Sequence, residues 1–236
     1  MTTIVILSAA ANEIEPFFSL VSIQEKIQKG VVSFVKGNFA QHTLILGITG
    51  VGLVNSSTIS TLAISWFKPD LLLFCGVAGG ISPEVNTGDV VVANEVTQSE
   101  HFSINTSFLE TPFAHYLNNP HHNILQPEWL PSLQITPLEM APTNYPIHYG
   151  RIVSTDQFPA PMREYALLLR ENVLAIDMET FGMYQAGWLT GVPTIGVRGI
   201  SNTLLEDGTD PDMQQADITQ VPQHAAQVCL GIIAQL

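Results

Sequence analysis

The stretch "VLAIDMETFGMYQAGWLTGVPTIGVRGISN", residues 173–202, spells out a strand, a helix and a second strand in succession. The first apolar run covers residues 173–178 and the second covers 193–200, with a predicted helix at about 179–189 between them. Strands that alternate with helices predict a largely parallel sheet covered by helices on both faces. The unit therefore places the chain in the α/β class.

The same alternation extends outward from this unit in both directions. Further strands are predicted at 3–8, 71–75, 88–96 and 150–155, with "GVVSFVKG" and "QHTLILGI" as a pair turning at "GNFA". Further helices are predicted at 52–67, at about 161–171 and at the C-terminus up to Leu236. The spacing of helix 52–67 puts one set of apolar residues on a single side, namely Val54, Ile59, Leu62, Ala63 and Trp66. Residues 1–236 are expected to form one domain.

An excursion at about 101–149 departs from this alternation, because it is rich in proline and holds five of the seven histidines. A long excursion of this kind in a compact domain is either a packed functional loop or a partly disordered segment. The pair His121–His122 suggests a metal, but no Cys is near and no second His stands at helical i,i+4 spacing. We expect no metal and no cofactor.

Composition excludes several classes of partner. The chain has 8 Lys and Arg against 21 Asp and Glu, a formal net charge of −13. Such a surface repels nucleic acid and anionic lipid, because binding phosphates needs cationic side chains. The apolar runs are too short for a membrane span, and the N-terminus lacks the basic region of a signal peptide. Cys75 and Cys229 supply no disulfide framework, so a cytoplasmic enzyme is expected.

Polar clusters follow five of the predicted strands at their carboxyl ends. They are Glu13, "GVAGG" at 76–80, "STDQF" at 154–158, "DMET" at 177–180 and "RGISN" at 198–202. In open α/β sheets, ligands bind beyond the carboxyl ends of the strands. We therefore expect these clusters to meet at one rim and to form the functional site.

Each cluster also has a purely structural interpretation. The glycines of 76–80 fit a tight turn as well as a close approach of the backbone to a ligand. The stretch lacks the lysine of a P-loop. Glu13 and Glu179 could each be a charge at a helix start. Glu179 could instead accept hydrogen bonds from vicinal hydroxyls, with Met178 as an apolar wall for a sugar.

Taken together, four stretches resemble the purine nucleoside phosphorylase and nucleosidase superfamily, especially its bacterial methylthioadenosine/S-adenosylhomocysteine nucleosidases and futalosine hydrolases. The matching stretches are "IVILSAAANEIEPF", "GITGVGLVNSSTISTLAISWFKPDLLLFCGVAGGISPEVNTGDVVVANEV", "VSTDQF" and "AIDMETFGMYQAGWLTGVPTIGVRGISN". The resemblance implies a three-layer αβα fold with a central mixed sheet, a homodimer and a small-molecule purine nucleoside as substrate.

The resemblance also implies roles for individual residues. Glu13 matches the carboxylate that polarises the attacking water, and Arg198 matches a strand-end arginine. Asn202 stands where the adenosine-type enzymes carry an Asp that protonates the purine at N7. Together these are the predicted catalytic residues. The predicted substrate-binding residues are Val77, Ala78, Gly79, Phe158, which matches an aromatic that packs on the base, Asp177, Met178, Glu179 and Ser201.

Two positions depart from the family pattern. Val77 replaces the usual Ser or Thr, and Asn202 replaces the acid. An Asn amide donates a hydrogen bond but no full proton, which suits a 6-oxopurine leaving group. The stretch "RGISN" with Asn resembles the futalosine hydrolases, and this resemblance implies hydrolysis of futalosine to hypoxanthine and dehypoxanthine futalosine in menaquinone biosynthesis. A methylthioadenosine/S-adenosylhomocysteine or aminodeoxyfutalosine nucleosidase stays open, as does a nucleoside-binding or storage protein.

Overall fold

The computed structural model describes five parts of the chain, which are residues 2–98, 124–125, 143–157, 172–204 and 218–236. Phe158, the helix predicted at 161–171 and most of the excursion at 101–149 lie outside them. The elements are β1 (Thr3–Ser8), α1 (Ala11–Leu20), β2 (Ser22–Lys29), β3 (Val32–Phe39), β4 (His42–Ile48), α2 (Leu53–Phe67), β5 (Leu71–Gly80), β6 (Val90–Gln98), β7 (Ile124–Leu125), β8 (Ile147–Ser154), β9 (Val173–Asp177), α5 (Thr180–Thr190), β10 (Thr194–Thr203), the 3₁₀ turn η4 (Ile218–Gln220) and α6 (Val221–Ile233).

The strands form a single mixed sheet in the order β10-β6-β8-β9-β5-β1-β4-β3-β2, with β7 added to β6. Strand β5 also pairs with β10, so β5, β10, β6, β8 and β9 pair in a closed circuit. The pairs β1–β4, β1–β5 and β10–β5 are parallel, whereas β2–β3, β3–β4 and β10–β6 are antiparallel. The predicted central mixed sheet is confirmed, although it is less parallel than the alternation suggests.

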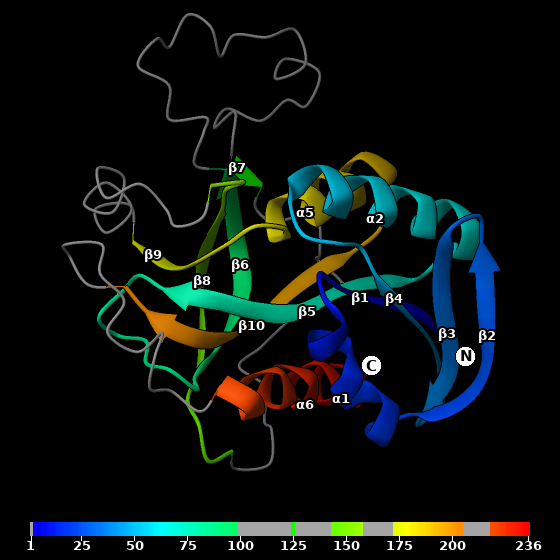
Figure 1. Cartoon of the computed structure of the whole chain (residues 1–236), viewed down its shortest axis with the longest axis horizontal. Helices are drawn as coiled ribbons and strands as arrows, with labels where there is room; N and C mark the ends of the chain where they lie inside the picture. The colour runs from blue at the N-terminus through cyan, green and yellow to red at the C-terminus, as the bar shows by residue number, and fades with distance from the viewer. Residues whose placement is uncertain (1, 99–123, 126–142, 158–171, 205–217) are drawn as a thin grey trace, which may run out of the picture.

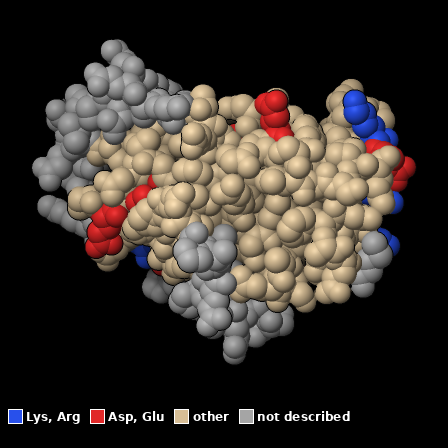
Figure 2. Space-filling view, turned by 90° about the horizontal axis from the view of Figure 1, so that it is seen from below, with Lys and Arg blue, Asp and Glu red and all other residues tan. Residues whose placement is uncertain are grey.

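Helices cover both faces of the sheet and give three layers (Figure 1). α2 and α5 lie on one face, and α1 and α6 lie on the other. Each face has its own apolar core, because consecutive strand residues point to opposite sides. In β1, for example, Val5 and Leu7 pack towards α2 and α5, while Ile4 and Ile6 pack towards α1 and α6. Charged side chains are sparse on the face seen in Figure 2, and most of the basic ones lie at the end where β2 and β3 are.

Two predictions about individual elements were wrong. Strand β5 does not end at Cys75: it continues through the glycines to Gly80 and pairs there with β9 and β10. The buried side of α2 was predicted only in part: Ala63 is buried and Ile59 and Trp66 pack against the core, but Val54 is 74% exposed. The small residues Ser56 and Ser60, which were not predicted, are buried as well. They are buried because α2 packs closely against α5: a Cβ at Gly182 of α5 would lie 2.7 Å from the carbonyl oxygen of Leu53.

Candidate active site

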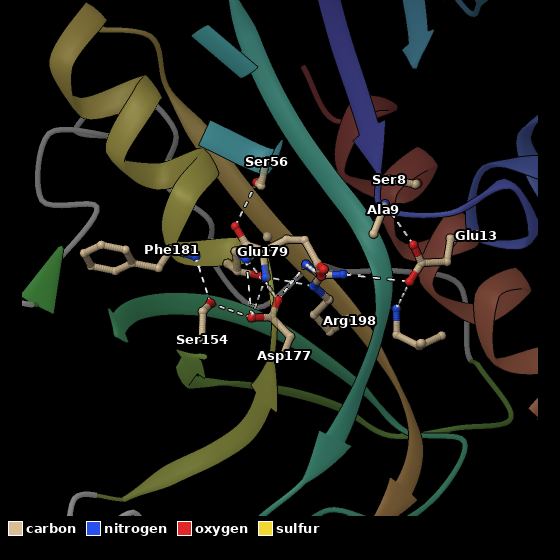
Figure 3. A network of polar contacts seen from close by, with 12 residues as sticks. Ser8, Ala9, Glu13, Ser56, Ser154, Asp177, Glu179, Phe181 and Arg198 are labelled. Carbon is tan, nitrogen blue, oxygen red and sulfur yellow. Dashed lines mark hydrogen bonds and ion pairs between the residues drawn. The ribbon is translucent and has the colours of Figure 1, made fainter. Parts of the chain in front are cut away.

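Five elements bring predicted residues together at the rim of the sheet (Figure 3). Glu13 comes from the first turn of α1, Val77 from β5, and Arg198 from β10. Asp177 ends β9, and Glu179 is the N-cap of α5. Their polar atoms form one network of hydrogen bonds and ion pairs. The strand-end argument thus located the cluster correctly.

Three backbone amides donate hydrogen bonds to the carboxylate of Glu13. The amides of Ala9 and Ala10 donate to Oε2 at 2.9 and 3.0 Å, and the amide of Val77 donates to Oε1 at 2.8 Å. The side chain is buried and lies at the N-terminus of α1, where the helix dipole favours negative charge. These contacts fix the carboxylate as a hydrogen-bond acceptor, which is what a general base needs.

The guanidinium of Arg198 is fully buried among three carboxylates. Its Nη2 lies 2.6 Å from Asp177 Oδ2 and 3.3 Å from Glu179 Oε2, and its Nε donates to Thr180 Oγ1 at 3.0 Å. Nη1 lies 4.0 Å from Glu13 Oε1 and has no hydrogen-bond partner among the described residues. One cation therefore links the Glu13 side of the site to the Glu179 side.

Two opposing effects act on the ionisation of Arg198. Burial alone would lower its pKa, but the charges of Asp177, Glu179 and Glu13 outweigh burial and raise the pKa above its usual value. The guanidinium also lies over the ring of Phe74, 4.4 Å from its centroid, a favourable cation–π contact. β10 is buried from Thr194 to Ile200. It can carry Arg198 there because the charge of the guanidinium is compensated from several sides.

For Glu179, in contrast to Arg198, burial outweighs the attraction of the opposite charge. Burial raises its pKa to about 7, with Arg198 lowering the value and the charge of Asp177 raising it. Its Oε1 accepts the backbone N–H of Gly52 at 3.0 Å. A carboxyl group with a pKa near neutrality in a buried cluster is a frequent mark of a functional site.

Gly76 shows why a glycine is needed in β5. A Cβ built on Gly76 would lie 2.2 Å from Arg198 Nη1 and 2.6 Å from Glu13 Oε1. Both side chains occupy the space that a Cβ would take. The glycine-rich stretch 76–80 therefore serves close approach of side chains rather than a turn.

Asn202 lies near the end of β10, after an irregularity in its pairing with β5 between Ile200 and Asn202. Ser201 Oγ lies 2.7 Å from Asn202 Oδ1 and 3.2 Å from the carbonyl oxygen of Ala78. A Cβ on Gly79 would lie 3.5 Å from Asn202 Nδ2, so the amide lies over the glycine stretch. This places Ser201, Asn202, Ala78 and Gly79 together.

Three contributors to the network were not singled out from the sequence. Ser154 donates its hydroxyl to Asp177 Oδ1 at 2.5 Å, Thr180 donates its hydroxyl to Asp177 Oδ2, and Gly52 donates its amide to Glu179. Ser154 and Thr180 belong to the clusters "STDQF" and "DMET", so their position at the strand ends was predicted from the sequence. Their hydrogen-bond partners were not predicted. Met178, which stands between Asp177 and Glu179 in the sequence, is partly buried.

The described parts of the chain offer no metal site formed by three or more His, Cys, Asp or Glu side chains. None of the helices in those parts is both long enough and apolar enough to cross a membrane.

Comparisons with known proteins agree with this fold. A 5′-methylthioadenosine/S-adenosylhomocysteine nucleosidase from Maridesulfovibrio salexigens is 26% identical over 217 residues, covering 85% of this chain and 88% of that protein. A nucleosidase of the same name from Colwellia psychrerythraea, solved with adenine, has a TM-score of 0.81 at 19% identity, covering 100% and 96%. Futalosine hydrolase of Helicobacter pylori has a TM-score of 0.74 at 22% identity, covering 100% and 98%. Residues 3–236 match the family model described as the phosphorylase superfamily. The chain belongs to the phosphorylase superfamily, as its strand-end motifs predicted.

Proposed function

We propose that this protein hydrolyses the N-glycosidic bond of a 5′-substituted purine nucleoside, with futalosine as the preferred substrate. The observation that carries the proposal is the rim cluster, in which one buried guanidinium joins the Glu13 carboxylate to the Glu179 carboxylate. The names of the relatives, which are nucleosidases, support the reaction class. The products from futalosine would be hypoxanthine and dehypoxanthine futalosine, a step of menaquinone biosynthesis.

Water fits the site better than phosphate as the nucleophile. Of the six Lys and Arg residues that the structure describes, Arg198 alone forms an ion pair with the rim carboxylates. A phosphate dianion placed among three carboxylates and one guanidinium would be poorly compensated. Val77 supplies no hydroxyl, and its amide is already donated to Glu13. A water molecule polarised by Glu13 needs no further cation.

The charge of the cluster also suits the reaction. Cleavage of an N-glycosidic bond passes through a cationic, oxocarbenium-like ribosyl group. The three carboxylates Glu13, Asp177 and Glu179 outnumber the one guanidinium of Arg198, so the ionised cluster is net negative. Preorganised negative charge stabilises a cation that develops in the transition state.

The base end favours a 6-oxopurine. The hydroxyl of Ser201 donates a hydrogen bond to Asn202 Oδ1. The amide nitrogen of Asn202 therefore points away from Ser201, and it is a hydrogen-bond donor. A 6-oxopurine presents acceptors at N7 and O6 and carries departing charge on O6, so a neutral donor suffices. Adenine benefits from a full proton at N7, which an amide does not supply.

The test of the proposal is a side-by-side assay of futalosine, its 6-amino form, inosine and methylthioadenosine in phosphate-free buffer. We expect free sugar as product and the highest kcat/KM with futalosine. Faster turnover of methylthioadenosine would instead make the chain a methylthioadenosine/S-adenosylhomocysteine nucleosidase, the activity named for most of its relatives. Release of no purine from any of the four would favour the nucleoside-binding or storage alternative. A homodimer and a cytoplasmic location stay predictions.

Asn202→Asp is expected to shift the preference towards methylthioadenosine. The new carboxyl group can deliver a proton to N7, and one matched or unmatched buried polar group is worth roughly 1–3 kcal/mol, or about 5- to 150-fold. The ratio of kcat/KM for methylthioadenosine over futalosine measures the shift. Asn94→Asp, the same change at an exposed position of β6, is the control. An unchanged ratio in Asn202→Asp would remove Asn202 from base selection.

The pH dependence of kcat/KM should reflect Glu179. Its ionised form is needed to accept sugar hydroxyls, and burial raises its pKa to about 7. Below that pH the rate is expected to fall about tenfold per pH unit. Assays with futalosine between about pH 5 and about pH 9 measure this limb. A flat profile down to about pH 5.5 would show that an ionised Glu179 is not required.

A further inference from the structure

Asp177 was predicted to bind substrate, yet its carboxylate is wholly engaged with protein groups. Oδ1 accepts the hydroxyl of Ser154 at 2.5 Å and the amide of Glu179 at 3.3 Å. Oδ2 accepts the amide of Thr180 at 3.1 Å and its hydroxyl, and pairs with Arg198 Nη2 at 2.6 Å. Two carboxylate oxygens offer about four acceptor positions. These contacts fill them.

The surroundings of Asp177 are closed as well. Its side chain is 1% exposed, and Ser154, which donates to it, is itself fixed by the amide of Phe181 at 2.9 Å. Figure 3 shows Asp177 between Ser154 and Arg198, with Glu13 on the far side of the guanidinium. A nucleoside hydroxyl could reach Asp177 only by displacing one of these groups.

The contacts instead fix the orientation of Arg198. Nη2 is held by Asp177 and Nε is held by Thr180 Oγ1, whose own hydroxyl is donated to Asp177. Two points on one planar guanidinium set its orientation. The remaining nitrogen, Nη1, is then directed to the space beside Gly76 that it shares with Glu13 Oε1.

We propose that Asp177 is a positioning residue that acts through Arg198 and makes no contact with the nucleoside. Together with the Thr180 hydroxyl it holds the guanidinium so that Nη1 points to the Glu13 side, where water attacks. This inference rests on the roles proposed above for Glu13 and Arg198. It separates the rim carboxylates into two that act at the substrate, Glu13 and Glu179, and one that fixes the cation between them.

Asp177→Asn tests the proposal, because it keeps the size of the side chain and removes its charge. We expect kcat to fall by about 10²-fold, the typical cost of a small misplacement of a catalytic group, with KM within a few-fold of the native value. Asp89→Asn is the matched control, since Asp89 is also a buried aspartate in an ion pair, with His148 at 2.9 Å. It should lower the melting temperature while kcat stays native. A folded Asp177→Asn with native kcat, or with a raised KM alone, would overturn the proposal.

Thr180 supplies a second and gentler test if Asp177→Asn does not fold. Thr180→Val removes the hydroxyl that links Arg198 to Asp177, while Thr180→Ser keeps it. We expect kcat to fall in Thr180→Val and to stay near native in Thr180→Ser; equal values in the two would contradict the proposal. Glu13→Gln, assayed alongside, separates the two ideas. Full activity of Glu13→Gln would contradict water activation by Glu13. The kcat values of the Asp177 and Thr180 variants decide whether Asp177 positions Arg198.

Discussion

Glu13→Gln is expected to lower kcat by about 10²- to 10⁴-fold, the range that general acid–base catalysis supplies. The carboxylate accepts three backbone N–H groups, from Ala9, Ala10 and Val77, and faces the guanidinium of Arg198. A neutral amide in its place cannot take a proton from water, and its NH₂ group would face one of the backbone donors. Purine release in phosphate-free buffer measures kcat, and inhibition by free hypoxanthine shows whether the base end still binds.

Glu15→Gln is the control for this experiment, because Glu15 is exposed on the same helix two residues further on. It should leave kcat at the native value. Strict dependence on added phosphate, with a sugar 1-phosphate as product, would contradict the hydrolase proposal itself. A Glu13→Gln enzyme with native kcat would leave the hydrolase class open but would remove Glu13 as the group that activates water.

The strand ends were the predictable part of the site. Apolar runs at 3–8, 173–178 and 193–200 give β1, β9 and β10 within a few residues, and polar residues directly after such runs must emerge at one rim of the sheet. Glu13 and Glu179 meet for that reason, whereas Arg198 lies within β10, paired with Gly76 of β5. The family resemblance added their roles, which no spacing of residues could supply.

The partners of these residues were less predictable, because they depend on contacts between distant segments. The amide of Gly52 reaches Glu179 across 127 positions of sequence, and Ser154 reaches Asp177 across 23. Strand β5 was predicted to stop at Cys75, because glycines usually end strands. At Gly76, Arg198 and Glu13 occupy the space that a side chain would take, and the strand continues to Gly80.

Sequence hydrophobicity was a poor guide to two elements of the fold, β2 and α2. β2, "SIQEKIQK", is exposed along almost its whole length and carries little apolar signal, so it was not predicted. It forms because β3 offers a free edge to pair with. In α2 the small residues Ser56 and Ser60 are buried by close helix contact, and side-chain hydrophobicity does not report this.

Glu179→Ala is expected to lower kcat/KM for ribonucleosides by about 10²- to 10⁴-fold. Each oxygen of Glu179 already accepts one protein donor, from Gly52 and from Arg198, and so has a lone pair left for a ribose hydroxyl. A hydrogen bond to a charged group is worth about 1.5–3 kcal/mol, and two of them give the expected range. These contacts should tighten as the ring flattens towards the oxocarbenium-like transition state, so that kcat falls along with kcat/KM.

A cycle of enzyme and substrate changes shows whether Glu179 binds the hydroxyls. The native enzyme should cleave the 2′-deoxy form of its substrate at least about tenfold more slowly than the ribonucleoside, whereas Glu179→Ala should cleave the two at similar rates. The loss on removing the 2′-hydroxyl is thus expected only when its acceptor is present. If Glu179→Ala keeps the full discrimination, the hydroxyl has another partner. If it cleaves ribonucleosides at the native rate, Glu179 is only a charge at the start of α5, the structural interpretation that its place in the sequence also allowed.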